Sequence, residues 1–266
     1  MKFWKMEACG NDFIMVLEEP GTDYSQMAKM LCPAHTAIGA DGLIVVRPKP
    51  LTMIFYNADG SEGKMCGNGL RCFVWLCHLL GLDDHNYVKV QTLGGVMEGW
   101  VRGEELVEEN FGQPILSCQE MGMHTLDATW LDKPISYNGK EAICSCLQVG
   151  ALHCVTFNKP FETNDAKALH ASPLFLDRMN VNFVEVQDRH NIILHTYERG
   201  VGWTLACGTG SAASSYITYK KGLVDKDVTV HEMMGDLHVS IKDDGIHLTG
   251  PARVVYVGYT EGETHA

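Results

Sequence analysis

Two cysteines of this chain stand in nearly the same local sequence. Residues 57–72 read NADGSEGKMCGNGLRC, and residues 198–214 read ERGVGWTLACGTGSAAS. In both stretches a glycine, a polar residue and a second glycine follow the cysteine, and a helix-like run comes next. Glycines allow a sharp turn of the backbone at such a point. Because the plan of strand, Cys-Gly-x-Gly turn and helix occurs twice, the sequence predicts two halves of similar fold.

The pattern of apolar residues predicts many strands and few helices. Short alternating or apolar runs between turn signals are typical of strands. They cover residues 13–17, 43–46, 53–56, 87–90, 96–101, 142–149, 154–157, 183–186, 191–197, 228–230, 237–241 and 253–256. Helices are predicted for residues 24–32, 69–80, 161–171 and 210–221. The predicted fold class is therefore strand-rich α+β, with a crossover between the halves near residues 111–114.

Charge and hydropathy exclude several classes of partner. The 266 residues are 45% apolar and carry a formal net charge of −12 at pH 7. No cluster of lysine and arginine of the kind that phosphate backbones require is present, so we expect neither nucleic acid nor an anionic membrane as a partner. The N-terminal MKFWKMEACGNDF lacks an apolar signal core, and no later segment is long and apolar enough for a membrane span. We expect a soluble, cytoplasmic protein.

The ten cysteines are scattered and predict reduced thiols in a reducing compartment. Most should serve as small buried apolar residues. Cys144, Cys146, His153 and Cys154 come close together in sequence, but they lack the paired two-residue spacing of zinc sites. We therefore predict no metal there.

The two cysteine turns favour anion binding and acid/base chemistry. Backbone N–H groups converge at a helix start, where the helix dipole is positive, and a carboxylate is the natural ligand. The same field is expected to lower the pKa of the cysteine. A single turn of this kind is more often a tight turn with a buried cysteine. A matched pair in two similar halves favours chemistry instead.

Two matched thiols suit a carbon acid that is attacked from both faces. One thiolate removes the α-proton and the opposite thiol returns a proton, so that the configuration inverts. The helix N-termini would stabilise the negative charge of the carbanionic transition state. No cofactor is then needed, and no lysine stands in a setting that marks a pyridoxal Schiff base. The pattern predicts an amino acid racemase or epimerase that uses Cys66 and Cys207.

The chain resembles the diaminopimelate epimerase family over nearly its whole length. The matching residues are Met1-Lys2-Phe3, Lys5-Met6, residues 10–13, residues 38–42, residues 57–72, Val149-Gly150, residues 153–155, Asn180-Val181, residues 198–210 and residues 249–252. The resemblance implies two pseudo-symmetric domains, each of strands wrapped around a central helix, with the active site in the cleft between them. The domains would be residues 1–113 plus 252–266, with Cys66, and residues 114–251, with Cys207. It also implies independence from pyridoxal phosphate, a free amino acid as substrate, and a homodimer.

The resemblance also assigns roles to individual residues. Cys66 and Cys207 would be the acid/base pair, and His153 and Glu198 would lie near the thiols. The α-carboxylate would bind donors of Gly67, Asn68, Gly208 and Thr209. The far end of the substrate would be held by Asn11, Asn57, Asn180 and Arg199. Taken alone, each asparagine is more often a turn residue, Arg199 a surface ion-pair partner, and His153 a satisfied strand histidine.

Two departures from the family pattern concern the substrate. Ala151-Leu152-His153 stands where the family has Asn-Pro-His, and Trp203 stands where glutamate is common. Loss of an amide and gain of an aromatic face predict a changed side-chain pocket, with histidine as the favoured substrate and Trp203 in contact with it. The alternative is the conversion of L,L-diaminopimelate to its meso form. A more remote alternative is a thiol redox sensor or binding protein on the same scaffold.

Overall fold

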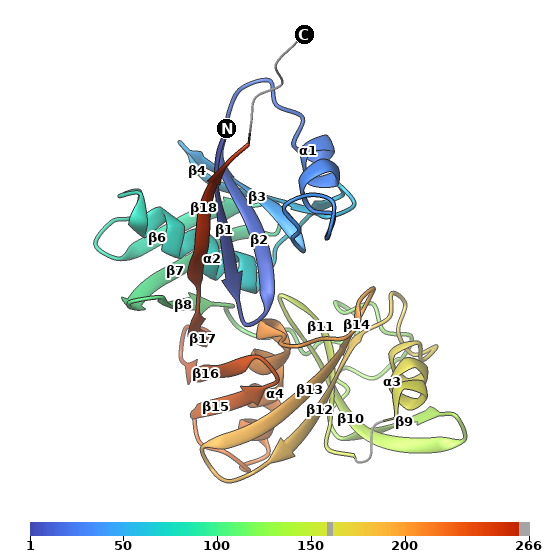
Figure 1. Ribbon diagram of the computed structural model, residues 1–266. Helices are drawn as coiled ribbons and strands as arrows, with labels where there is room; N and C mark the ends of the chain where they lie inside the picture. The colour runs from blue at the N-terminus through green and yellow to red at the C-terminus, as the bar shows by residue number, and fades with distance from the viewer. Residues whose placement is uncertain (159–161, 261–266) are drawn as a thin grey trace. The chain divides into compact units, whose positions relative to one another are not determined.

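The computed structural model describes residues 1–158 and 162–260, and the chain divides into two compact units (Figure 1). Unit 1 comprises Met1–Glu109 and the segment that begins at Thr249, and unit 2 comprises Asn110–Leu248. Within the described ranges, no helix is long and apolar enough to cross a membrane.

Over the described residues, each unit contains two helices and many strands. The elements that lie mainly in unit 1 are β1 (Lys2–Ala8), β2 (Asn11–Leu17), α1 (Tyr24–Leu31), β3 (Gly42–Pro48), β4 (Leu51–Asn57), β5 (Glu62–Gly63), α2 (Gly67–Leu79), β6 (Tyr87–Thr92), β7 (Gly95–Gly103), β8 (Leu106–Asn110) and β18 (Arg253–Tyr259). Those that lie mainly in unit 2 are β9 (Lys133–Tyr137), β10 (Lys140–Val149), β11 (Ala151–Thr156), α3 (Thr163–His170), β12 (Asn180–Val186), β13 (Asn191–Glu198), β14 (Gly202–Trp203), α4 (Gly208–Lys220), β15 (Asp227–Glu232), β16 (Gly235–Lys242) and β17 (Gly245–Pro251).

The strand pairings of unit 1 recur in the same order in unit 2. In unit 1, β1 pairs antiparallel with β2, β2 parallel with β3, β3 antiparallel with β4, and β4 parallel with β6. In unit 2, the pairs β10–β11, β11–β12, β12–β13 and β13–β15 repeat these directions. The predicted α+β fold of two pseudo-symmetric halves is confirmed.

The register of the strands also repeats. In unit 1, Tyr56 pairs with Glu62 on the short strand β5, and the helix with Cys66 follows. In unit 2, Tyr197 pairs with Trp203 on β14, and the helix with Cys207 follows. The two cysteines are therefore structurally equivalent positions of a repeated unit.

One helix covers each face of the sheet in unit 1. Successive side chains of a strand point to opposite faces. Met6, Phe13 and Ile44 pack with residues of α2, whereas their neighbours Ile14 and Leu43 pack with Tyr24 and Ala28 of α1. Continuous apolar runs such as LIVV in β3 are buried on both faces, as expected of a strand covered on both sides.

The same arrangement occurs in unit 2. Val181, Phe183 and Tyr197 share a buried cluster with Ala166 and Leu169 of α3. The alternate residues of the same strands lie on the opposite face, which α4 covers: a side chain on Gly210 of α4 would come within 3.1 Å of Asn182 and Thr196. This second face contains the polar groups of the candidate site.

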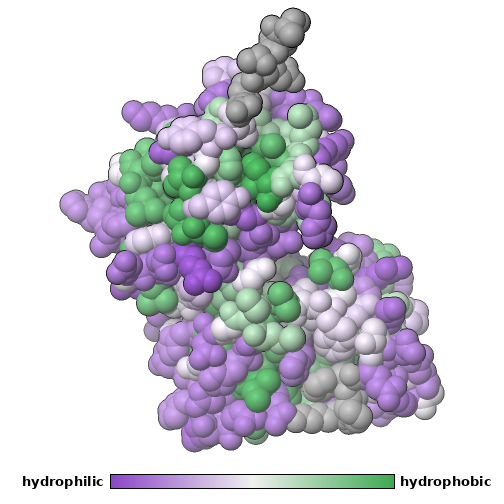
Figure 2. Space-filling model, in the orientation of Figure 1, coloured by the Kyte–Doolittle hydropathy of each residue, from purple (hydrophilic) through white to green (hydrophobic). Residues whose placement is uncertain are grey.

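Strand β18 presents apolar side chains to the surface of unit 1. It pairs antiparallel with β1, and four of its apolar residues are exposed, namely Val255, Tyr256, Val257 and Tyr259. Figure 2 shows apolar surface in the region of unit 1 where β18 runs in Figure 1.

The predicted helices correspond to α1, α2, α3 and α4, but two of them start earlier than predicted. The predictions began at Gly69 and Gly210, whereas α2 and α4 begin at Gly67 and Gly208, because each cysteine is itself the N-cap. Phe161, the predicted start of the third helix, and residues 261–266 of the predicted first domain lie outside the described residues.

Six strands were not predicted, and for three of them the sequence shows why. They are β1, β5, β8, β9, β14 and β17. Strands β5 and β14 have two residues each, too few for a pattern. In β1, Lys5 interrupts the apolar run, but it is buried and forms an ion pair with Asp12. Only the tertiary partner makes a lysine compatible with that position.

Candidate active site

Both cysteines lie at the mouth of a helix. Cys66 and Cys207 have extended backbones, with φ/ψ of −139°/120° and −137°/101°, and the helix starts at the following residue. The first N–H groups of α2 and α4 therefore belong to the residues that directly follow the two cysteines. Such groups are unpaired within the helix and carry positive partial charge.

The second glycine of each motif permits close packing of helix on sheet. A Cβ atom on Gly69 would lie 2.8 Å from Ile44, and one on Gly210 would lie 3.1 Å from Asn182. Neither glycine has a positive φ. At both positions the first helical turn lies so close to the strands that a Cβ atom would require neighbouring side chains to shift.

Cys66 faces an amide cluster in unit 1. Its Sγ atom lies 3.6 Å from Oδ1 of Asn11, and Nδ2 of Asn68 lies 3.4 Å from the same oxygen. Nδ2 of Asn11 donates to a carboxylate oxygen of Asp41, which leaves Oδ1 of Asn11 as the acceptor. Cys66 is partly exposed. The structure thus brings together the predicted residues Asn11, Cys66 and Asn68.

Cys207 faces a buried histidine relay in unit 2. Its Sγ atom lies 3.6 Å from Oγ1 of Thr209, which lies 3.0 Å from Nε2 of His153. On the other side of the ring, Nδ1 of His153 lies 3.1 Å from Nδ2 of Asn182. His153 is fully buried, and burial lowers its pKa to about 4, so the ring is neutral near pH 7.

The partner of Asn182 defines the tautomer of His153. Nδ2 of Asn182 also donates to the carbonyl oxygen of Gly210 at 3.2 Å, which orients the amide nitrogen toward the ring. Nδ1 must then accept, and the proton resides on Nε2, which donates to Thr209. The hydroxyl proton of Thr209 is left to point toward the sulfur of Cys207.

Two carboxylates flank Cys207. The carboxyl group of Glu198 hydrogen-bonds to the thiol, and burial raises the pKa of Glu198. Glu232, on β15, accepts the backbone N–H of Cys207 at 3.2 Å and the hydroxyl of Ser211. Glu232 was not predicted, since no motif surrounds it and only the pairing of β13 with β15 brings it near the helix start.

These surroundings correct one expectation about the thiols. The helix N-terminus was expected to lower the pKa of the cysteine. The pKa of Cys207 is instead raised well above its usual value, mainly by burial and then by the negative charges of Glu198 and Glu232. The hydroxyl of Thr209 and the N–H of Gly210 oppose that rise without cancelling it. These surroundings favour a protonated Cys207.

Three residues predicted to hold the far end of the substrate make local contacts. Nδ2 of Asn57 lies 3.0 Å from the hydroxyl of Ser61, within the turn that follows β4. Oδ1 of Asn180 accepts the backbone N–H of Arg199 at 2.9 Å. The guanidinium of Arg199 pairs with Asp177.

Trp203 lies on the sheet face opposite to Glu198. It pairs with Tyr197, so both project to the side that α3 covers, whereas Glu198, the next residue along β13, projects to the other side. The indole packs edge-to-face on Tyr197 at 5.4 Å, and its Nε1 donates to Thr163 at 3.0 Å. These contacts are those of a packing residue beside α3.

The cysteines Cys144, Cys146 and Cys154 lie on the same α3-facing side and are buried in an apolar cluster. Over residues 1–158 and 162–260, no three histidine, cysteine or acidic side chains are grouped so as to hold a metal ion.

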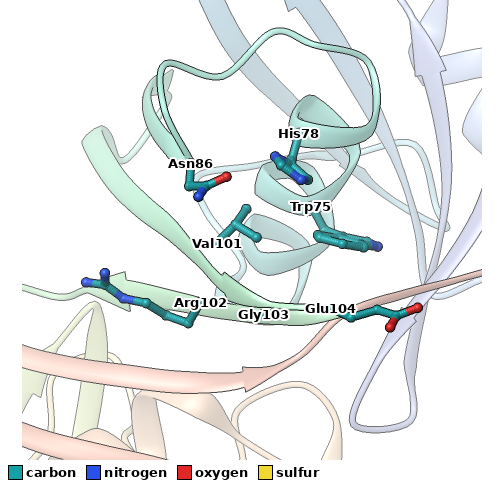
Figure 3. A pocket seen from close by; sticks show the side chains of 7 residues that line it. All are labelled: Trp75, His78, Asn86, Val101, Arg102, Gly103 and Glu104. Atoms are coloured by element: carbon teal, nitrogen blue, oxygen red, sulfur yellow. The ribbon is translucent and has the colours of Figure 1, made fainter.

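Two pockets of about 410 Å³ each occur in unit 1. The first, between α2 and β7, is lined by Trp75, His78, Asn86, Val101, Arg102, Gly103 and Glu104 (Figure 3). None of the predicted site residues is among them. The second is lined in part by Asp12 and Asp41, which adjoin Asn11.

The repeat makes the two thiol environments equivalent in backbone but different in chemistry. By strand register, Phe13 occupies in unit 1 the place that His153 has in unit 2. Likewise, Asn57 ends β4 where Glu198 ends β13. Cys207 therefore has an imidazole and a carboxylate as neighbours, whereas Cys66 has amides.

Comparison with solved structures places this fold among proteins that include an amino acid epimerase. A hydroxyproline epimerase from Agrobacterium vitis, solved with bound trans-4-hydroxy-L-proline, has a TM-score of 0.66 at 12% identity, over 97% of this chain and 91% of that chain. A phenazine biosynthesis protein of the PhzF family from Enterococcus faecalis has a TM-score of 0.67 at 15% identity, over 97% of both chains.

Sequence comparison identifies the family. The profile described as Diaminopimelate epimerase matches residues 3–116 and 145–255. A protein named diaminopimelate epimerase from Caldanaerobacter subterraneus subsp. tengcongensis is 39% identical, over 98% of this chain and 100% of its own length. Another of that name, from Halothermothrix orenii, is 37% identical over 97% of both. The chain belongs to the diaminopimelate epimerase family and is an isomerase of the racemase/epimerase class.

Proposed function

We propose that this protein interconverts L,L- and meso-diaminopimelate by a two-thiol mechanism without a cofactor. The observation that carries the reaction is the pair of equivalent N-cap cysteines, Cys66 and Cys207, at the starts of α2 and α4. The observation that favours the substrate is the name of the full-length relatives, which are 33–39% identical.

In this mechanism one thiolate removes the α-proton and the other thiol protonates the opposite face. The N–H groups of Gly67, Asn68, Gly208 and Thr209 bind the α-carboxylate and stabilise the carbanionic transition state. Neither sulfur requires a metal or pyridoxal to carry out its own step.

Glu198 accounts for the activation of Cys207. With two carboxylates nearby, the thiol of Cys207 holds its proton. The α-ammonium group of a substrate beside Glu198 offsets that negative charge and lowers the pKa of the thiol. Thiolate then forms when substrate is present, and the neutral His153 holds the hydroxyl of Thr209 toward the sulfur. Binding and activation are thus coupled through charge.

Diaminopimelate replaces histidine as the favoured substrate. The histidine hypothesis depended on Trp203 as an aromatic wall of the pocket. The indole packs beside α3, on the sheet face opposite to Glu198. This position does not favour contact between Trp203 and a substrate bound near Glu198. The names of the relatives support diaminopimelate as the substrate. In our proposal, Trp203 is then a packing residue, and the second amino acid head is held by Asn11, Asn57, Asn180 and Arg199.

The experiment is a comparison of substrates in deuterated buffer. Purified protein is incubated with L,L-diaminopimelate and, separately, with L-histidine, and the stereoisomers and their deuterium content are resolved. We expect conversion of L,L-diaminopimelate to the meso form with deuterium at the α-carbon. Conversion of histidine with diaminopimelate unchanged would reverse the assignment. Exchange on neither substrate would favour a binding or redox protein.

We also propose that the protein is a homodimer in which β18 is covered by a second copy. Val257 and Tyr259 are alternate residues of β18, so they share one face of the strand and give it exposed apolar surface that water solvates poorly. Sedimentation velocity should show a dimer at micromolar concentration, and Val257→Lys should shift it to monomer. A wild-type monomer at that concentration would contradict the proposal.

A further inference from the structure

Arg71 is a fully buried cation next to the candidate site. It lies on α2, and its side chain has no exposed surface. One guanidinium nitrogen donates to Oε1 of Glu109 at 2.8 Å, and the other donates to Oδ1 of Asn68 at 2.6 Å. Nε donates to the carbonyl oxygen of Pro251 at 3.3 Å. The fork of Arg71 therefore joins a buried carboxylate to a residue of the anion-binding turn.

This ion pair is poorly explained by stability alone. Both side chains are fully buried. Because transfer of two charges out of water has a large free-energy cost, a well-packed apolar pair often gives a folded protein equal or greater stability. Among the described residues, Oε2 of Glu109 has no hydrogen-bond partner. Burial raises the pKa of Glu109, and the guanidinium opposes that rise. A half-satisfied buried pair indicates a role other than holding the core together.

The contacts of Arg71 fix the orientation of Asn68. Because Arg71 donates to Oδ1, the amide nitrogen of Asn68 must point the other way, toward Oδ1 of Asn11 at 3.4 Å. The same oxygen of Asn11 faces the sulfur of Cys66 at 3.6 Å. A continuous path of contacts therefore runs from Glu109 to the thiol.

In unit 2 the second residue of the helix is also held by a neighbouring side chain, but by a different type of residue. Thr209 corresponds to Asn68, since each is the second residue of its helix. Thr209 is held by Nε2 of His153 at 3.0 Å. In unit 1 the position equivalent to His153 is Phe13, which has no hydrogen-bonding group. Arg71, on helix α2, therefore orients Asn68, as His153, on strand β11, orients Thr209.

We propose that Arg71, held by Glu109, is the positioning residue of the Cys66 half-site: it orients Asn68 and, through Asn11, the thiol of Cys66. The effect on turnover rests on the proposed epimerase function, whereas the effect on the thiol does not. Neither Arg71 nor Glu109 touches the substrate in this proposal.

The decisive variant replaces the whole pair by apolar residues. Arg71→Met with Glu109→Leu leaves no uncompensated buried charge, so the fold and melting temperature should be retained. We expect kcat/KM for diaminopimelate to fall about 10- to 100-fold, the range typical of residues that orient a reacting group. We also expect iodoacetamide to alkylate Cys66 several-fold faster, since its thiol loses a fixed acceptor, while Cys207 reacts at the wild-type rate.

Two further variants keep the test sharp. Arg71→Lys retains the positive charge beside Glu109 but lacks the planar fork that reaches both partners, so it should show the same two changes. Cys77→Ala, a core change farther along α2, should show neither. A well-folded double variant with kcat/KM and Cys66 alkylation within twofold of wild type would overturn the proposal. If no variant or wild type epimerises diaminopimelate, the alkylation rates still decide whether Arg71 positions Cys66.

Discussion

The imidazole Nε2 atom of His153 lies 3.0 Å from the hydroxyl oxygen of Thr209. Because Asn182 occupies the other ring nitrogen as a donor, the imidazole is a neutral donor toward Thr209. The neutral ring adds no positive charge beside Cys207, and the hydroxyl oxygen of Thr209 lies 3.6 Å from the sulfur. The histidine therefore acts on the thiol through the hydroxyl of Thr209 and not through a charge of its own.

Loss of either thiol should abolish inversion. Cys66→Ala and Cys207→Ala each remove one of the two acid/base groups, and we expect kcat to fall by about 10²–10⁴-fold or more. Stereoisomer analysis of diaminopimelate measures the rate, and circular dichroism checks the fold. Cys77→Ala is the matched control. A single variant that epimerises at the wild-type rate would rule out the two-thiol mechanism.

The tautomer of His153 should depend on Asn182. Asn182→Asp places an acceptor where the amide donates, so the proton should move to Nδ1 and the pKa of His153 should rise above about 4. Nε2 would then no longer donate to Thr209, and we expect kcat/KM to fall about 10- to 100-fold. Histidine NMR titration and kinetics measure the two effects. Asn164→Asp, on the exposed surface of α3, should change neither, and an unshifted His153 would refute the tautomer assignment.

His153 should make the fold sensitive to acid. Its pKa is about 4 in the folded protein and near 6.5 when unfolded, so the unfolded chain binds more protons between these values. The stability from the neutral ring is fully present above pH 6.5 and is lost as the pH falls toward 4, by up to about 3 kcal/mol. Urea unfolding at several pH values measures the slope. His153→Phe should reduce the slope over that window, and an equal slope in the variant would contradict the prediction.

Removal of one carboxylate should acidify Cys207. Glu232→Gln keeps an oxygen that accepts the N–H of Cys207 and the hydroxyl of Ser211, but it removes a negative charge that raises the pKa of the thiol. The pH midpoint for alkylation of Cys207, followed by mass spectrometry, should shift to lower pH. Glu141→Gln, at an exposed site on β10, serves as the control. A midpoint that stays the same or rises would show that Glu232 does not control the thiol.

Local sequence was sufficient to predict the repeated plan of strand, cysteine turn and helix. A cysteine followed by Gly-x-Gly before a helix-forming run specifies the start of a helix within a few residues of chain, and in both units the cysteine is the N-cap. The strand-rich α+β class follows from apolar periodicity in the same way, because each strand's pattern is written in its own residues. Helix starts were displaced by two residues because glycine, usually a poor helix former, tolerates the first turn at Gly67 and Gly208.

The surroundings of the thiols were decided by tertiary structure. Glu232 reaches Cys207 only because β15 pairs with β13, and Glu109 reaches Arg71 from β8. Trp203 is only four residues before Cys207 in the sequence. It lies on the sheet face opposite to Glu198, because its pairing with Tyr197 sets the side to which it points. The sequence alone thus identified the two cysteine turns and the helices that follow them. Long-range strand pairing determined the pKa and the hydrogen bonds of Cys207, because it buries the thiol and brings Glu232 beside it from a segment far away in the chain.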